Sequence, residues 1–496
     1  MKPRNRNILL VALGFALVAA MCVCAASAGF IAYSFFGDTV TNILEDPAAI
    51  FDSPPVTSDS LVEPHTPIGA DVDLASLFSP FWESRVLIHE DFYVQPVDDA
   101  LLAQGALQGL TTALEDFGIY LDEINLPADA ASPKELAAEA ETPTEIMALF
   151  TDFWAAWGRA EYADIENQLT YEDLMHASLR GMVNALGDEH TQFLDPSQLR
   201  LSEISLQGEY EGIGAWVDTT TEYLTIIAPM EGSPAEAAGL QPGDRVLAID
   251  GDDMTGIPGD AVINRILGPA GSTLVMTIDR ESVAQPFDVE ITRAAIFVSS
   301  VQGEILEGNI AYVQLFSFGA TSDRELRNIL EELLAQNPSG LIFDMRNNGG
   351  GFLDTSIQVA SEFIGDGVIL FEQFGDGTRQ TYEALADGLA TQIEMVVLVN
   401  GGSASASEIV AGALQDHSRA LLVGDTTFGK GSVQVSPLLS DNQGSLRITI
   451  AHWLTPDERE IHGIGLQPDV IVPLTEEDIA AGNDAQLQRA IELLTQ

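Results

Sequence analysis

The sequence predicts an α/β protein with a β-rich insert and a helical region ahead of it. From Gly308 onward, short apolar runs alternate with helical segments, which is typical of a layered α/β core. Between about Ser205 and Arg280, β-like runs alternate with Gly/Pro turns. Before them, apolar residues recur at helical spacing. We therefore expect five parts in the chain. They are a membrane helix (1–36), a linker (37–73), a helical region (74–200), the β-rich insert (201–296), and the α/β core with a C-terminal tail (297–496).

An N-terminal membrane anchor is expected. Three basic residues precede an apolar run from Ile8 to Phe36, which exceeds the ~7–15 residues of a signal-peptide core and is long enough for the ~20 residues that span a bilayer. We expect a single-pass signal anchor in the cell membrane, with the rest of the chain periplasmic or extracellular. Cleavage after the Ala26–Ala28 triplet is the alternative. The acidic, Pro-containing stretch that follows has no clear period, which predicts a tether.

The helical region contains an internal repeat. Leu77–Trp82 (LFSPFW) recurs 72 residues later as Leu149–Trp154 (LFTDFW), and Leu101–Asp116 matches Asp173–Asp188 at the same offset. The spacing predicts two copies of a helical hairpin, joined by an acidic, Ala-rich insert around Leu126–Thr144. Such a region can make contacts in a homo-oligomer or can simply pack within the chain, and both interpretations stay open.

The charge of the chain argues against a nucleic acid partner. It has 75 acidic and 21 basic residues, a formal net charge of -54, and such a surface would repel phosphates. Acidic side chains that solvate the surface explain this excess. Lysine is nearly absent and occurs only as Lys2, Lys134 and Lys430. The presence of a lysine at position 430 therefore needs an explanation.

The β-rich insert is similar to a PDZ domain. The stretches GEYEGIGAWV, GSPAEAAGLQPGDRVLAIDG and GPAGSTLVMTIDR follow one another in the order expected of that domain. The resemblance implies a groove in which a substrate peptide adds as a strand, and in which three loop residues offer backbone N–H groups to its terminal carboxylate. These residues are Gly212, Ile213 and Gly214.

Ser405 lies at a predicted change from a strand to a helix. The apolar run EMVVLVN leads into GGSASASEIV, in which Ser405-x-x-Glu408 matches the capping box that opens helices. A helix start also supplies free N–H groups that can stabilise an oxyanion. A capping serine and a nucleophilic serine are therefore compatible interpretations.

A nucleophilic serine needs a base, and Lys430 is the better candidate. His417 lies at the far end of the same predicted helix, ~18 Å along its axis, so it cannot reach Ser405. Lys430 follows a strand and stands between two glycines, and a neutral lysine can act as a general base. Other histidines could approach the serine only through tertiary folding, namely His190, His452 and His462.

Several long motifs together resemble the carboxyl-terminal processing (tail-specific) proteases. These motifs are GDEHTQFLDP, FDMRNNGGG, NGGSASASEIVAGALQDHSRALLVGDTTFGKGSVQ and TPDEREIHGIGLQPDVIV, with the PDZ-like region between the first and second. The likeness runs from about Tyr171 to Val472. It implies a crotonase-like α/β core with an inserted PDZ domain. It also implies a serine–lysine dyad that cuts exported proteins near exposed, apolar C-termini.

The resemblance also implies roles for single residues. Ser405 matches the nucleophile, Lys430 the base, and Gln434 the residue that orients the lysine. The backbone N–H groups of an oxyanion hole fall on Gly350, Gly351 and Ala406. Two acidic residues match family positions in supporting roles, namely Glu408 and Asp416.

No metal site or cofactor is expected. RNNGGG lacks the lysine and Ser/Thr of a nucleotide-binding loop. Both cysteines, Cys22 and Cys24, lie in the predicted anchor, so the rest of the chain has no thiol nucleophile. The sequence departs from the family in its duplicated helical region and in Trp453, where the family usually has tyrosine.

Two other functions are weighed against the protease. The first is a non-catalytic scaffold whose PDZ-like groove binds peptide tails while the dyad is idle. The second is a Ser–His–Asp hydrolase that uses His190 or His452. The intact set of Ser405, Lys430 and Gln434 favours the serine–lysine protease over both.

Overall fold

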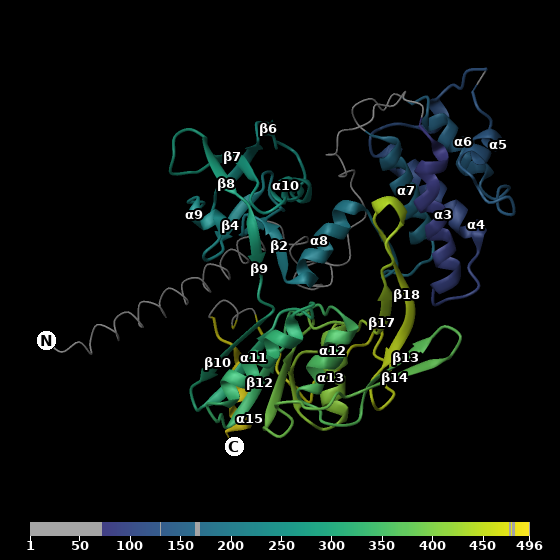
Figure 1. The fold of residues 1–496 in the computed structure, drawn as a ribbon. Coiled ribbons are helices and arrows are strands. Elements are labelled where there is room, and N and C mark those ends of the chain that lie inside the picture. The colour runs from purple at the N-terminus through teal and green to yellow at the C-terminus, as the bar shows by residue number, and fades with distance from the viewer. Residues whose placement is uncertain (1–71, 129, 164–168, 476–477, 479–481, 496) are drawn as a thin grey trace.

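The structure is a computed structural model that describes residues 72–496 except 129, 164–168, 476–477, 479–481 and 496. The predicted transmembrane helix lies outside the described residues. Among those residues, no helix combines the length and apolar character needed to cross a bilayer. Figure 1 shows the PDZ-like insert at the upper left of the α/β core and the helical region at its upper right, with the long ribbon of β17 (Ser432–Val435) and β18 (Ser445–Leu454) reaching from the core to the helices.

A six-stranded sheet forms the centre of the α/β core. Its strand order is β10-β11-β12-β15-β16-β19, and only the pair β10–β11 is antiparallel. All residues of β12 and β15 are buried, as expected for central parallel strands covered on both faces. The bounds are β10 (Val301–Leu306), β11 (Ile310–Leu315), β12 (Gly340–Asp344), β15 (Met395–Val399), β16 (Leu421–Gly424) and β19 (Val470–Ile471).

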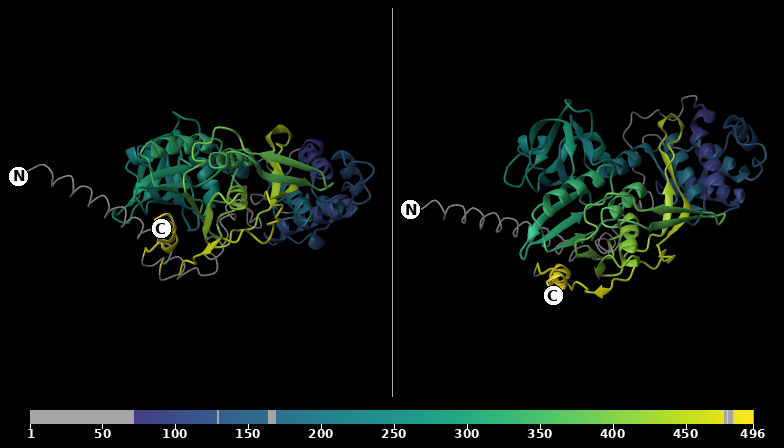
Figure 2. Two further views of the ribbon diagram at one scale, coloured as in Figure 1. Left: turned by 90° about the horizontal axis from the view of Figure 1, so that it is seen from below. Right: turned by 60° about the horizontal axis from the view of Figure 1, so that its bottom comes forward.

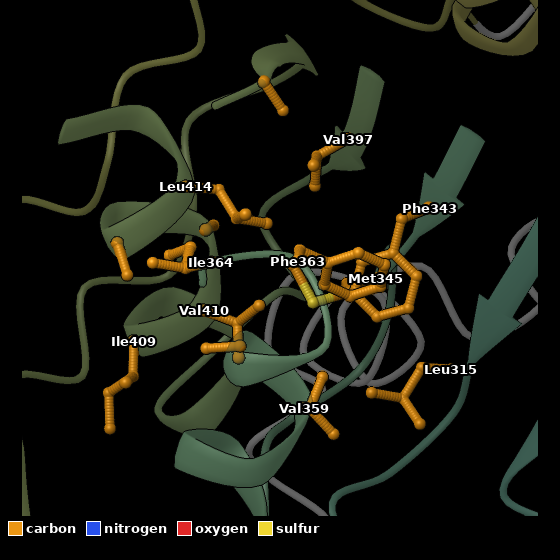
Figure 3. Packing of buried hydrophobic residues seen from close by; sticks show 14 of the residues in the cluster. Leu315, Phe343, Met345, Val359, Phe363, Ile364, Val397, Ile409, Val410 and Leu414 are labelled. Carbon is orange, nitrogen blue, oxygen red and sulfur yellow. The ribbon is translucent and has the colours of Figure 1, made fainter. Parts of the chain in front are cut away.

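Helices cover both faces of this sheet because alternate strand residues point to opposite sides. Helices α11 (Ser322–Leu334), α12 (Leu353–Ser361) and α13 (Ala406–Asp416) cover one face. Figure 3 shows apolar side chains of strands and helices meeting in this layer. The C-terminal helix α15 (Ala485–Leu494) packs through Ala490 on the other face. It lies beside the C label at the margin of the core in Figure 2.

A second sheet joins the core to the helical region. Its order is β1-β18-β13-β14, and β17 also pairs with β18. Strand β1, which follows helix α7 (Tyr171–Asn184), pairs antiparallel with the start of β18. The bounds are β1 (Gln192–Leu194), β13 (Val368–Phe374), β14 (Arg379–Glu383), β17 (Ser432–Val435) and β18 (Ser445–Leu454), with the 3-10 turn η3 (Ser440–Asn442) before β18.

The region predicted to be helical is helical. Each copy of the sequence repeat forms a pair of helices, α3 with α4 and α6 with α7, and the insert between them contains the short helix α5. A core rich in aromatic residues lies between the pairs and also receives Leu446 and Ile448 from β18. The bounds are α3 (Leu74–Asp91), α4 (Asp99–Glu115), η2 (Leu121–Glu123), α5 (Pro133–Glu139), α6 (Thr151–Ala160), α7 (Tyr171–Asn184) and α8 (Pro196–Gln207).

The β-rich insert has its own small core. Its main sheet has the order β3-β4-β5-β7-β8, with β6 beside β5, and β2 pairs with β9 where the chain enters and leaves. Two helices lie between these strands, α9 (Pro234–Ala237) and α10 (Gly259–Ile266). The strands are β2 (Glu209–Gly212), β3 (Ala215–Asp218), β4 (Thr225–Pro229), β5 (Arg245–Ile249), β6 (Asp252–Asp253), β7 (Thr273–Asp279), β8 (Phe287–Thr292) and β9 (Ala294–Phe297).

Candidate active site

Ser405 occupies a strained turn between β15 and α13. Its backbone has φ +53° and ψ −115°, a combination that residues with a side chain rarely adopt. Such strain persists only where the surroundings enforce it, and it is typical of the sharp strand-to-helix turn that presents a nucleophilic serine. Neighbouring residues hold the turn, since Ala404 N and Ser407 Oγ both donate hydrogen bonds to Asn348 O, at 3.0 and 2.8 Å.

The buried Glu408 carboxylate ties this turn to the segment around Lys430. Its Oε2 atom accepts hydrogen bonds from Ser405 N at 2.9 Å and from Lys430 N at 2.8 Å. Its Oε1 atom accepts from Gly429 N at 2.7 Å and from Thr427 Oγ1 at 2.5 Å. Burial raises the pKa of Glu408 although these four donors act in the opposite direction. The residue that the sequence predicts as a helix cap therefore also holds the second segment.

Lys430 is buried next to the start of β17. Only 8% of its surface is exposed, and its carbonyl oxygen accepts a hydrogen bond from Trp453 Nε1 at 3.1 Å. The Trp453 side chain thus helps to fix the backbone of the lysine. With its N–H bound to Glu408 and its carbonyl bound to Trp453, Lys430 is held from both sides.

Gln434 lies on β17, on the same face as Ser432. Its Nε2 atom donates to Ser432 Oγ at 2.8 Å and to Thr449 Oγ1 at 3.2 Å. Lys430 precedes the strand, and the register with β18 shifts between Val433 and Gln434. The regular pairing of β17 with β18 is therefore interrupted after Val433.

The loop that carries Gly350 lies directly against the Ser405 turn. A Cβ atom at Gly350, where φ is +108°, would be 2.9 Å from each of three atoms of that turn, namely Ala404 O, Ser405 Cβ and Ala406 N. Only glycine fits such an approach. The Gly350 N–H donates to Asn348 Oδ1 at 2.9 Å, so an oxyanion at this donor would share it with Asn348 or displace that side chain. Gly351 forms a bridge with Phe318 next to it.

Asn348 and a buried ionic network are parts of the site that the sequence interpretation missed. Arg346, two residues before Asn348, contacts Asp344 at 2.6 Å and Asp484 at 2.8 Å. Burial acts to raise the pKa of Asp484, but hydrogen bonds and the charge of Arg346 outweigh it and lower that pKa. The FDMRNNGGG motif contained the signal, since a charged pair at the end of an apolar strand needs partners.

Asp416 and the histidines occupy other positions. Asp416 ends α13, so ten helical residues and ~15 Å of helix axis separate it from the serine turn. There it forms an ion pair with Arg459 and accepts a hydrogen bond from Asp457 N at 2.9 Å. His452 stacks on Tyr93 with ring centroids 4.5 Å apart, and His462 lies 4.7 Å from His452.

His190 belongs to the same group of rings. The His190 and His462 ring centroids are 6.1 Å apart, which completes the group of three imidazoles. Burial and the charges of His452 and His190 lower the pKa of His462. The three histidines named as alternative bases thus lie beside β18 and beside β17, the strand that directly follows Lys430.

The predicted carboxylate loop of the PDZ-like insert is partly occupied by a side chain of the same chain. The Tyr210 ring covers Gly212. Burial raises the pKa of Tyr210, although the nearby N–H groups of Ala215 and Gly214 act on its hydroxyl in the opposite direction. Ile213 is buried in the core of the insert. The sequence interpretation missed Tyr210, because a tyrosine two residues before a glycine loop carries no signal of where its ring points.

An apolar cavity of about 560 Å³ extends from this loop toward the core. The insert contributes Tyr210, Ile213 and Ile266, whereas the core contributes Phe316 and Asn347. Asn347 directly precedes Asn348 in the loop of Gly350. The cavity therefore connects the predicted tail-binding groove with the loop beside Ser405.

Two family profiles match the chain. That of peptidase family S41 matches residues 309–472, and that of the PDZ domain matches residues 225–280. The first match contains both Ser405 and Lys430. The second lies within the predicted β-rich insert.

Characterised relatives are similar over most of the same region. The carboxyl-terminal-processing protease of Synechocystis sp. is 36% identical over 340 residues, which are 67% of this chain and 79% of the relative. The carboxy-terminal-processing protease of Bartonella bacilliformis is 35% identical over 328 residues, which are 64% of this chain and 74% of the relative. A solved photosystem II D1 C-terminal processing protease is 25% identical, with a TM-score of 0.42, and the match covers 84% of this chain and 98% of that one.

Proposed function

Because this chain belongs to the carboxyl-terminal-processing proteases of peptidase family S41, we propose that Ser405 is its nucleophile and Lys430 its general base. The protein is a serine protease with a PDZ domain, and its substrates are proteins processed near their C-termini. The shared Glu408 oxygen is the observation that carries the assignment of the dyad. It brings the backbones of both residues to one buried atom.

In the proposed reaction, Lys430 carries a proton in both steps, the formation of the acyl-enzyme and its hydrolysis. Neutral Lys430 takes the proton of Ser405 Oγ as that oxygen attacks the scissile carbonyl carbon. The lysine then gives this proton to the leaving amine as the C–N bond breaks, and an acyl-enzyme remains. Water deprotonated by Lys430 attacks the acyl carbon, and the returning proton restores Ser405.

We assign the oxyanion hole to the backbone N–H groups of Gly350, Gly351 and Ala406. The helix start at Ala406 favours negative charge because its first N–H groups lack partners within the helix. The close approach of Gly350 to Ala406 supports this assignment. Gln434 is assigned to orient the lysine, with Glu408 and Asp416 as supporting residues that act on backbone segments.

The proposed specificity is for apolar C-terminal tails. The N–H groups of Gly212, Ile213 and Gly214 would face the terminal carboxylate, and the apolar cavity beside them would take the last side chains. We further propose that the run Ile8–Phe36 holds the enzyme in the cell membrane with its catalytic part outside the cytoplasm.

The dyad is tested by substitution in the full chain. Ser405→Ala, Lys430→Ala and Lys430→Arg are compared for cleavage of an unfolded protein with an apolar C-terminus. We expect activity to fall at least 1,000-fold in all three, on the order of other catalytic pairs that act as a unit. Lys430→Arg must fail because a guanidinium does not deprotonate in a protein. The matched control is Lys134→Arg at an exposed lysine, and wild-type cleavage by Lys430→Arg would refute the dyad while leaving the protease class intact.

A further inference from the structure

The two copies of the helical repeat contact each other through equivalent residues. We define the first hairpin as α3 with α4 and the second hairpin as α6 with α7. A residue of the first hairpin corresponds to the residue 72 positions later in the second. Phe81 and its equivalent Phe153 stack on each other, with ring centroids 6.0 Å apart and planes inclined by 19°. Equivalent residues can meet in this way only near an axis that relates the two copies.

The aromatic contacts around this pair are reciprocal. Phe78 lies 5.9 Å from Phe153, and the exchanged pair of Phe150 and Phe81 is 6.0 Å apart. A second set of centroid distances repeats the pattern. Phe78 is 4.8 Å from Trp154, and the exchanged pair of Phe150 and Trp82 is 5.2 Å apart.

The contacts between α4 and α7 are reciprocal as well. Cβ atoms at Gly105 and Gly181 would each be 2.3 Å from the carbonyl oxygen of the other residue. The contact of Gly181 with Gly105 O has an exchanged equivalent, because a Cβ atom at Gly109 would be 2.1 Å from Ala177 O. Gly109 and its own equivalent Gly181 approach so closely that a Cβ atom at Gly181 would be 2.7 Å from Gly109 Cα. The same exchange therefore relates the backbones and the aromatic side chains.

This reciprocity is the property that distinguishes an isologous interface, in which residue i contacts j and j contacts i across a two-fold axis. We propose that the helical region is a dimer of hairpins joined within one chain, and that its interface is specific for a hairpin of the same kind, including one from a second copy of this chain. In the intact protein the two hairpins occupy each other's surface. This surface is then closed to other chains until one hairpin is displaced.

The second hairpin has the side chains that a pair of identical hairpins would need. Its Phe150, Phe153 and Trp154 repeat the residue types at the matching positions of the first hairpin. In such a pair Ala177 would take the place of Gly105, so its contact with Gly181 would have to follow the native approach of Ala177 to Gly109, not that of Gly105 to Gly181. Two second hairpins could therefore repeat the aromatic contacts of the native pair and meet through two contacts between Ala177 and Gly181.

The test blocks one hairpin in the full chain. In the first variant, Gly105→Leu and Gly109→Leu place side chains where backbone atoms of α7 lie. Native mass spectrometry of the detergent-solubilised chain should then show twice the mass of one chain, because the free second hairpins pair. Adding Gly181→Leu to this variant should return the mass to that of one chain. The matched control is Ala100→Leu on the exposed side of α4, which should leave the wild-type mass unchanged.

A mixture gives a second measurement if the free second hairpin pairs poorly with itself. Chains with Gly181→Leu alone keep a usable first hairpin. Equal mixing with the variant that carries Gly105→Leu and Gly109→Leu should produce a heterodimer through one native pair of hairpins. Single-chain masses for both variants and for their mixture would overturn the proposal.

Discussion

The Oε2 atom of Glu408 accepts the backbone N–H of Lys430 at 2.8 Å. The same atom also accepts the N–H of Ser405 at 2.9 Å, so one carboxylate oxygen sets the spacing of two chain segments. A carboxylate suits this place because both of its oxygens only accept, and three of its four partners are backbone N–H groups. The geometry of the proposed dyad thus depends on a residue that takes no part in the proposed proton transfer.

Glu408→Gln should inactivate the enzyme although the side chain keeps its shape. Whichever way the amide turns, its NH₂ group faces at least one backbone N–H, which leaves buried donors without acceptors at about 1–3 kcal/mol each. We expect kcat to fall on the order of 100-fold and the thermal midpoint to drop. Both are measured beside Glu331→Gln, at an exposed glutamate of α11. Wild-type kcat in Glu408→Gln would show that the shared carboxylate is dispensable.

Tyr210→Phe should strengthen the binding of free C-terminal tails. The substitution removes the hydroxyl oxygen that lies near the N–H groups of Gly214 and Ala215, and a tail would no longer compete with it. KM for a peptide with a free carboxylate should fall about fivefold, which corresponds to roughly 1 kcal/mol for one such exchange. The amidated peptide serves as the control and should change little. An unchanged KM for the free acid would mean that the tail does not use these donors.

Asp484→Asn should destabilise the loop beside the proposed nucleophile, because Asp484 acts on that loop through Arg346. Asp484 caps α15 and contacts Arg346, which leads into the loop of Asn348 and Gly350. Loss of this charge leaves part of a buried guanidinium unpaired, and we expect destabilisation of roughly 1–3 kcal/mol. A lower kcat with little change in KM would indicate positioning of the loop. Glu492→Gln, in an exposed ion pair on the same helix, is the matched control, and equal behaviour of the two variants would contradict the prediction.

His176 should make the helical region sensitive to acid. Burial, with the nearby charge of Arg180, lowers the pKa of His176 to about 3. The unfolded chain then binds a proton near pH 6.5 that the folded chain refuses, so the contribution of His176 is complete above that pH and is lost as the pH falls toward 3.

Between pH 7 and pH 5, His176 should remove about 2 kcal/mol from the free energy of unfolding. Urea unfolding followed by tryptophan fluorescence reports on this region, because Trp154 and Trp157 lie in its core. His176→Leu should lose that part of the pH dependence. The same slope in both proteins would assign the acid sensitivity to other groups.

Much of the fold and the position of the serine turn could be predicted from sequence because they depend on local patterns. The strand-to-helix change at Ser405 and the reach of Glu408 back to its N–H follow from a capping box and an apolar run. The repeat also predicted two helical hairpins. In each case the signal lies within a few neighbouring residues.

What could not be predicted depends on where side chains point after distant segments meet. Nothing near Asn348 in the sequence indicates that its amide takes the Gly350 N–H, and nothing near Tyr210 places its hydroxyl in the carboxylate loop. One of the two ionic partners of Arg346, Asp484, is 138 positions away, in the C-terminal helix cap. The repeat predicted two hairpins, but the reciprocal contacts between them required the packed structure.

Strand β18 contacts both the helical region and β17. This arrangement bears on the stage of synthesis at which the enzyme can become active. Thr449 N donates to Thr191 Oγ1 at 3.0 Å across 258 positions, and β18 supplies Leu446 and Ile448 to the core of the helices. Contacts of such long range form slowly, because the closure entropy of a long loop is lost before they are made. The N-terminal helical region and β17, which follows Lys430, can therefore finish folding only after β18 is available. A nascent chain stopped before β18 has neither a finished helical core nor a partner for β17. We therefore expect proteolysis to begin only once almost the whole chain has emerged.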